Sequence, residues 1–207
     1  MERSHETFFD RPDTHWRNLS GALHVYALPD ANSYLVKEAR ETASWLNGAV
    51  ELAVQPVDYL HMTIQRLDLY REEIPAEIWD ELTNHLAMSV ADIESFDVEY
   101  APATVRAGAI EAVSDENPSW KGLVDAVRES FCNVGLKHAL VDPPFGPHYT
   151  VAYCVQDTDA QRDDELCQLL VDAPATSMRV SSVDLVAVDQ SPEEGVFRFS
   201  SLMHPVV

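Results

Sequence analysis

The chain has 207 residues, 46% of them hydrophobic, which is enough for one substantial core or two small lobes. Thirty-five acidic residues outnumber fourteen basic ones, and a net charge of −21 without a basic stripe argues against a protein that grips long nucleic acid. No run of about 18 apolar residues predicts a membrane span, and the polar N-terminus lacks the apolar segment of a signal peptide.

Residues 1–18 are polar and mixed in charge, and we interpret them as an N-terminal arm. We expect a single domain over residues 19–207. Its first strand is predicted at residues 22–28 and ends at a proline. A helix should follow, with Asp30 or Asn32 as its N-cap and apolar residues at helical spacing.

The next segment predicts a short strand at residues 50–54, a turn, and a strand at residues 60–67. A helix over residues 75–88 is then indicated, because Pro75 suits a first helical turn and apolar residues recur every fourth position. The second half predicts the same kinds of element. They are strands at 96–105 and 109–113, a loop at 114–118, a helix at 119–134, a strand at 148–155, a helix at 163–171, and strands at 178–188 and 195–203.

Two matching tetrapeptides lie in predicted strands, one in each half of the chain. They are His61-Met62-Thr63-Ile64 and His148-Tyr149-Thr150-Val151. Residues i and i+2 of a strand point to the same face, so each motif places an imidazole beside a hydroxyl. Two such strands facing each other would supply an acid, a base and two hydrogen-bond donors for phosphodiester chemistry without a metal. The simpler alternative is two ordinary strands whose His and Thr face solvent.

At these residues the chain resembles the 2H phosphoesterase superfamily, in particular the bacterial proteins known as 2′-5′ RNA ligases or RNA 2′,3′-cyclic phosphodiesterases. The resemblance covers about residue 20 to the end and implies an α+β fold. The fold would be bilobal, with two pseudo-symmetric lobes, antiparallel sheets around a central cleft and helices outside. It also implies that His61 and His148 are catalytic and that Thr63 and Thr150 bind the phosphate.

The reaction implied by this resemblance opens a 2′,3′-cyclic phosphate to a 2′-phosphate. By analogy, His148 would activate water and His61 would protonate the leaving oxygen. A 2′-5′ RNA ligase activity would be the same chemistry run backwards, with a ribose 5′-hydroxyl in place of water. Two other functions stay open: a module of this fold that binds nucleotide or phosphate without turnover, and an acidic protein that binds a basic partner.

Residues beside the motifs are further candidates for substrate binding. Strict alternation puts Arg66 on the face opposite Thr63, as a surface or ion-paired residue, unless the strand bends toward a phosphate. Gln65 shares the motif face by the same rule, and could equally be a polar residue at the cleft rim. Tyr153 stands where related proteins often have Arg, which removes a phosphate contact. Beyond the motif strands, Tyr26 and His24 are either core or surface residues or could stack on a base. Phe145 could border the cleft, whereas Tyr149 is expected in the core.

Neither a metal nor a cofactor is predicted. The remaining histidines and the carboxylates have no metal-ligand spacing, and no P-loop implies ATP. Three cysteines, Cys132, Cys154 and Cys167, lack CxxC spacing and indicate free thiols in a reducing cytoplasm. We therefore expect a cytoplasmic protein, a monomer without membrane contact, whose substrate is a small nucleotide or an RNA end.

Overall fold

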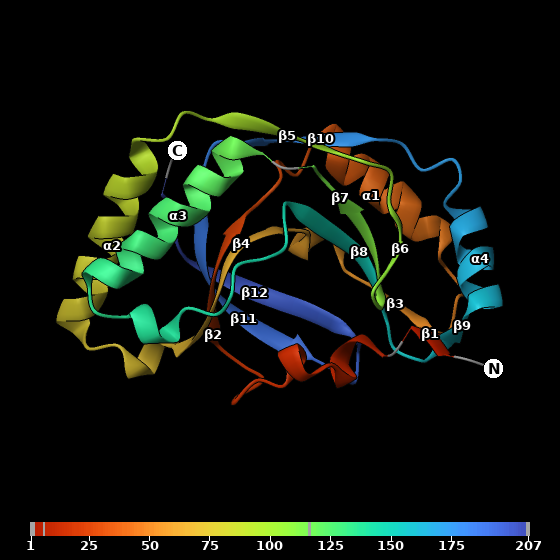
Figure 1. The fold of residues 1–207 in the computed structure, drawn as a ribbon, viewed down its shortest axis with the longest axis horizontal. Helices are drawn as coiled ribbons and strands as arrows, with labels where there is room; N and C mark the ends of the chain where they lie inside the picture. Colours follow the sequence, from red (N-terminus) through yellow and green to blue (C-terminus); the bar gives the residue numbers. More distant parts are fainter. Residues whose placement is uncertain (1–2, 6, 116, 206–207) are drawn as a thin grey trace.

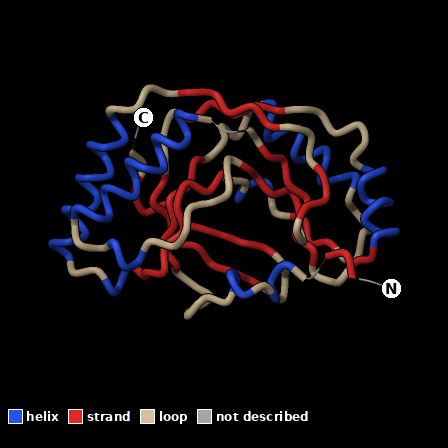
Figure 2. Tube along the Cα trace, in the orientation of Figure 1, coloured by secondary structure: helices blue, strands red, loops and turns tan. Residues whose placement is uncertain are grey.

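The computed structural model describes residues 3–5, 7–115 and 117–205 of the chain. Two antiparallel sheets occupy the middle of the molecule, and helices lie at both ends (Figures 1 and 2). Residues 1, 2 and 6 of the predicted arm and residue 116 of the predicted loop lie outside the described residues, as do residues 206–207. The predicted α+β fold class with antiparallel sheets is confirmed.

The first sheet holds the first motif and has four strands. In spatial order they are β12 (Val196–Met203), β11 (Asp184–Ser191), β2 (Ala22–Ala27) and β4 (Met62–Tyr70). The β2 strand is buried on both faces along its whole length, which explains why its sequence is mostly apolar without alternation. Both strands at the β12 edge come from the C-terminal end of the chain, so this sheet is not built from one half of the sequence.

The second sheet holds the second motif and also mixes the halves. In spatial order its strands are β3 (Leu52–Val54), β8 (His148–Cys154), β7 (Ala109–Val113) and β6 (Thr104–Arg106). Two further ladders flank the sheets. They pair β5 (Phe96–Tyr100) with β10 (Thr176–Val180), and β1 (Arg3–His5) with β9 (Thr158–Asp159).

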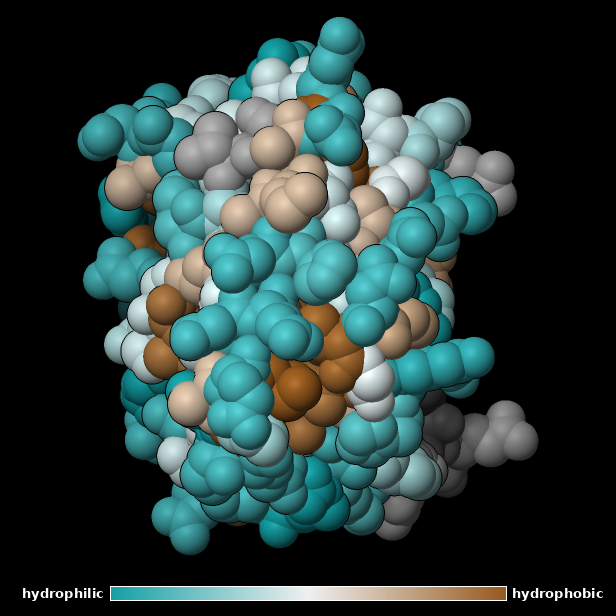
Figure 3. Space-filling view, turned by 90° about the vertical axis from the view of Figure 1, so that its left-hand side faces the viewer, coloured by the Kyte–Doolittle hydropathy of each residue, from teal (hydrophilic) through white to brown (hydrophobic). Residues whose placement is uncertain are grey.

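Two helices lie at each end of the molecule (Figure 1). At one end, α2 (Ala76–Ala91) packs on α3 (Pro118–Asn133), which contacts β4. At the other, α1 (Tyr34–Trp45) contacts β8 and β10, and α4 (Ala160–Leu169) contacts β6 and β9. The face toward α2 and α3 is mostly hydrophilic and shows one compact hydrophobic patch (Figure 3). Among the described residues, no helix has the length and apolar character needed to cross a bilayer.

The N-terminal arm packs over the junction of the two sheets. Its Phe9 is buried in a small hydrophobic cluster with Tyr26 of β2, Tyr153 of β8 and Phe197 of β12, and Phe8 and Trp16 cover this cluster. Aromatic pairs of this kind contribute about 0.5–1.5 kcal/mol each beyond their buried area. The arm therefore holds strands from both sheets together beside the two motifs.

Several predicted elements differ in their bounds. The single strands predicted at 96–105 and 178–188 are each two strands, β5 and β6, and β10 and β11, because each member pairs with a different ladder. The predicted caps of α1 are wrong. Ser33 is the N-cap, and its hydroxyl accepts a hydrogen bond from the Val36 amide, while Asp30 stabilises the preceding turn by accepting from the Asn32 amide.

Candidate active site

The two motif histidines are held in the same way. Nδ1 of His61 donates to the carbonyl oxygen of Tyr59, and Nδ1 of His148 donates to that of Gly146, each over 2.8 Å and two residues back along the chain. A carbonyl oxygen only accepts, so Nδ1 must bear the hydrogen. In the neutral ring, Nε2 is then the free basic nitrogen. Both imidazoles therefore present the same atom for proton transfer.

An aromatic ring is stacked on each histidine. Tyr26 of β2 lies on His61 with ring centroids 4.0 Å apart and an interplanar angle of 15°. Phe145, in the loop before β8, lies on His148 at 4.5 Å and 14°. Tyr26 is buried and exchanges a hydrogen bond of 2.9 Å with Nδ1 of His24, whereas Phe145 is 68% exposed. The rings restrict the imidazoles to one plane without occupying their Nε2 atoms.

A β-bulge interrupts each motif strand at the same place. In the β2–β4 ladder, Tyr26 faces Thr63 and Val25 faces Gln65, so Ile64 is the extra residue. The β7–β8 ladder has the corresponding irregularity at Val151. A bulge shifts the alternation of side chains by one residue. The residue three positions beyond each threonine therefore returns to the motif face.

This shift corrects the predictions for two residues. Arg66 lies on the same side as His61 and Thr63 and lines the cavity that they line, so strict alternation placed it on the wrong face. Gln65 does not lie at the cleft rim. It is fully buried, donates to the carbonyl oxygens of Arg66 and Val141, and accepts a hydrogen bond of 2.6 Å from Arg128.

A cavity of about 290 Å³ brings the predicted site residues together. Both motif histidines, both motif threonines and the four predicted substrate-binding residues line it, and these are His61, His148, Thr63, Thr150, Arg66, Tyr153, Tyr26 and Phe145. All four motif side chains are half-buried. Tyr149, by contrast, is buried in the core and exchanges a hydrogen bond with Thr176, as expected for the variable position of the motif.

Burial in this cavity changes the protonation of both histidines. It lowers the pKa of His61 to about 4, against the raising effect of the bond to Tyr59, and the charge of His148 lowers it further. Burial also lowers the pKa of His148, with smaller contributions from the cationic Arg106 and Arg66. Both rings are thus neutral at pH 7 in the free protein. An anion bound between them would favour their charged forms.

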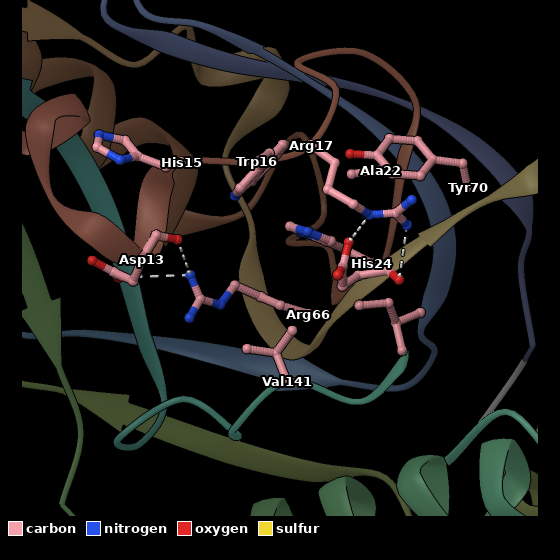
Figure 4. Close-up of a pocket in the computed structure, with 11 residues that line it drawn as sticks. Asp13, His15, Trp16, Arg17, Ala22, His24, Arg66, Tyr70 and Val141 are labelled. Carbon is pink, nitrogen blue, oxygen red and sulfur yellow. Dashed lines mark hydrogen bonds and ion pairs between the residues drawn. The ribbon is translucent and has the colours of Figure 1, made fainter. Parts of the chain in front are cut away.

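Two arginines from different elements, Arg11 and Arg66, line the cavity. Arg11 of the arm makes two hydrogen bonds to the Asp13 carboxylate, at 3.1 and 3.0 Å, and a third to the carbonyl oxygen of Ala107. Arg66 points toward the same Asp13, with Nη1 3.7 Å from its carboxylate (Figure 4). Asp13 therefore fixes one guanidinium from the arm and one from β4 beside the histidines.

A second, smaller pocket of about 160 Å³ adjoins the cavity and shares Asp13, His24 and Arg66 with it (Figure 4). His24 is 3% exposed, and its pKa is lowered well below the usual value, first by burial and then by Arg66 and His61. The predicted stacking role of His24 stays untested, but its hydrogen bond to Tyr26 supports the ring that covers His61.

Some cavity residues were not expected from the sequence. The arm contributes Phe8, Arg11 and Asp13, and the middle of β7 contributes Glu111. Nothing in the local pattern marks the arm, because its contacts are with strands distant in sequence. Glu111 does have a sequence signal, since it is a lone charge in the apolar run Ala109–Val113. Within the described residues, no group of three His, Cys, Asp or Glu side chains is arranged to hold a metal ion.

The model of the 2′-5′ RNA ligase superfamily matches residues 28–192. The chain belongs to this superfamily. A search of curated protein sequences gave no match. Among solved structures, Escherichia coli LigT complexed with 3′-AMP is similar at 17% identity and a TM-score of 0.62, covering 91% of this chain and 98% of LigT.

Two other solved structures have the same fold. TT0787 of Thermus thermophilus is 16% identical with a TM-score of 0.61, covering 89% of this chain and 97% of that protein. The MHV ns2 PDE domain is 14% identical with a TM-score of 0.55, covering 80% of this chain and 98% of that domain. At these identities the similarity establishes the 2H phosphoesterase fold and no more. The arm that lines the cavity precedes the residues that the superfamily model matches.

Proposed function

We propose that this protein is a metal-independent phosphodiesterase that opens 2′,3′-cyclic phosphates of nucleotides or RNA ends to 2′-phosphates. The observation that carries the proposal is the pair of histidines whose Nδ1 atoms are both bound to backbone carbonyls and whose rings line one cavity with Thr63 and Thr150. With a ribose 5′-hydroxyl in place of water, the same opening of the cyclic phosphate would break the bond to the 3′ oxygen and join two RNA ends through a 2′-5′ linkage, as in a 2′-5′ RNA ligase.

In the proposed mechanism, Nε2 of one histidine removes a proton from water as the water oxygen forms a bond to phosphorus. The bond from phosphorus to the 3′ oxygen breaks, and Nε2 of the other histidine, protonated beside the bound anion, donates its proton to that oxygen. Burial lowers the pKa of both histidines, so either neutral ring can act as the base in the free protein. By analogy with the family, His148 would be the base and His61 the acid.

The remaining groups of the cavity would bind the phosphate. The hydroxyls of Thr63 and Thr150 donate to non-bridging oxygens, and removal of one such donor typically costs about 10²–10³ in kcat. Arg66 supplies a positive charge from the same face as Thr63, and this is a stronger contact than a neutral hydrogen bond. Tyr26, Phe145 and Tyr153 form the aromatic walls against which the nucleoside would rest.

The test is turnover of the four 2′,3′-cyclic nucleoside monophosphates in the presence of EDTA. We expect activity in EDTA and a loss of about 10²–10⁴ in kcat for His61→Ala and for His148→Ala, because each removes one proton-transfer group. His138→Ala is the matched control, since His138 is exposed and is not among the residues that line the cavity. Full activity in both single variants would contradict the proposal. Tight nucleotide binding with no product would instead indicate a binding module.

We also propose a cytoplasmic location and a small nucleotide or an RNA end as the partner. All three cysteines are free thiols, which supports a reducing compartment. Co-purification of a basic protein together with indifference to nucleotides would favour the alternative of an acidic interaction protein.

A further inference from the structure

Glu111 is a buried carboxylate that the proposed mechanism does not use. It lies in the middle of β7 and is 7% exposed. Its side chain has no hydrogen bond to any part of the chain that the structure describes, and its ion pair with Nε of Arg106 is long, at 4.0 Å. A buried carboxylate without hydrogen bonds costs free energy, so its position in the cavity wall points to a ligand.

The position of Glu111 relates it directly to the motif threonine. In the β7–β8 ladder, Glu111 is the partner of Thr150, and directly opposed residues extend to the same face of a sheet. The first sheet places Tyr26 opposite Thr63 in the same way. Glu111 therefore occupies the position in the second sheet that Tyr26 occupies in the first. It lines the anion site beside Thr150 instead of covering a histidine.

The charge state of Glu111 follows from its surroundings. Burial raises its pKa to about 7, and the cations Arg106 of β6 and Arg11 of the arm oppose this effect. From β8 it is faced by Thr150 and by Tyr153, whose pKa is itself raised by burial. An ionised Glu111 would repel a phosphate beside Thr150. A neutral carboxylic acid would instead provide an O–H donor.

We propose that Glu111, as a neutral carboxylic acid, is a third hydrogen-bond donor of the anion site and binds a non-bridging phosphate oxygen beside Thr150. This inference rests on the proposed phosphodiester site and names a specificity residue within it. The ligand class is a tetrahedral oxyanion. A cyclic phosphodiester has two non-bridging oxygens, and the one beside Thr150 would accept hydrogen bonds from both Thr150 and Glu111.

The sign of the pH effect follows from linkage. A bound anion raises the pKa of Glu111 above its value in the free protein, so binding takes up a proton. Affinity is full below a pH of about 7, where Glu111 is already protonated, and falls up to about tenfold per pH unit above it. His61 and His148 also gain protons beside an anion. The two histidines contribute equally to the pH dependence of affinity in the wild type and in any variant of Glu111. The ratio of the variant's affinity to the wild-type affinity therefore cancels their contribution.

The probe is inorganic sulfate, which keeps two negative charges between about pH 6 and pH 9 and cannot be turned over. Its binding is measured by calorimetry for the wild type, Glu111→Gln and Glu111→Ala. Glu99→Gln is the control for charge, since Glu99 is exposed on β5. Thermal unfolding of each variant establishes that it is folded. Sulfate binding involves no bond breaking, so its result can be interpreted independently of whether the protein turns over cyclic nucleotides.

We expect Glu111→Gln to bind sulfate like the wild type near pH 6 and about tenfold more tightly at about pH 8, because the amide donates at every pH. Glu111→Ala should bind about 10- to 100-fold more weakly near pH 6, since a hydrogen bond to a charged group is lost. The same pH dependence in wild type and Glu111→Gln would overturn the inference. So would unaltered affinity in Glu111→Ala, or no sulfate binding by the wild type near pH 6.

Discussion

At the scale of single residues, the site depends on groups that orient other groups. Tyr153 is an example, because it lines the cavity together with Thr150, whose hydroxyl opposes the rise in the pKa of Tyr153 that burial causes. Phe8 of the arm packs on its ring, with centroids 4.5 Å apart. Phe8 thereby holds the Tyr153 ring in place in the cavity beside Thr150. The substrate-binding role of Tyr153 stays a prediction, and a role in positioning Thr150 can be tested beside it.

We expect Tyr153→Phe to lower kcat several-fold with little change in KM, because the phenol hydroxyl that acts on Thr150 is removed while the aromatic wall stays in place. Thr150→Val should lower kcat by about 10²–10³. The measurement is the steady-state kinetics of cyclic nucleotide opening. Tyr100→Phe serves as the control, since Tyr100 is equally buried but bonds to Met62 Sδ outside the cavity. An equal effect of Tyr153→Phe and Tyr100→Phe would argue against a positioning role.

At the scale of elements, a helix and a hairpin each require particular residues for reasons that do not involve the site. Gly122 lies in α3, is exposed, and an added Cβ there would meet nothing within 4 Å. Gly195 lies in the turn of the β11–β12 hairpin, directly before β12, with φ of +71°, and an added Cβ would collide with Ala53 Cβ and Val155 Cγ1. The same substitution should therefore have opposite effects at the two positions.

Gly122→Ala should raise the free energy of unfolding by about 0.5–1 kcal/mol, because alanine restricts the unfolded chain and favours helix. Gly195→Ala should lower it by about 1–3 kcal/mol through strain and overpacking. Urea unfolding of the two variants beside the wild type measures both changes. Destabilisation by Gly122→Ala would mean that α3 is packed differently on its outer face.

At the scale of the whole molecule, a local positive site is set in a negative protein. The net charge is −21, yet Arg11, Arg66 and Arg106 lie in or beside the cavity. Long-range repulsion of an anionic substrate extends over a Debye length, whereas contacts inside a half-buried site are screened much less. The repulsion by the net charge therefore acts at long range and is weakened by salt, whereas the attraction by the arginines acts inside the cavity and depends less on salt.

We expect kcat/KM for a cyclic nucleotide to rise a few-fold when salt increases from about 10 mM to about 150 mM, because the Debye length falls from about 30 Å to about 8 Å and the long-range repulsion is screened. Steady-state kinetics in potassium chloride measure this effect, with sucrose of equal osmolality as the control. A fall in kcat/KM with salt would show that the arginines dominate the field outside the cavity.

Much of the fold and the central part of the candidate site were predictable from the sequence. The two motifs lie in strands because both are embedded in apolar runs, and the helices follow the spacing of their apolar residues. These are local patterns. The bulges at Ile64 and Val151 were not predictable, because they exist only relative to the registers of β2 and β7. The cavity contacts of the arm were missed for a similar reason, since they depend on strands far away in the chain.

The bulges also have a consequence for how divergent members of the superfamily correspond to this chain. Both bulges fall between the threonine and the third residue after it, so Arg66 and Tyr153 reach the cavity from five positions beyond their histidines. In a relative whose strand is regular, the equivalent side chain would stand four positions beyond the histidine. An alignment without a gap at Ile64 would then pair that side chain with the buried Gln65. Immediately after each motif, residues that occupy equivalent positions in the two structures would therefore differ by one position in the aligned sequences.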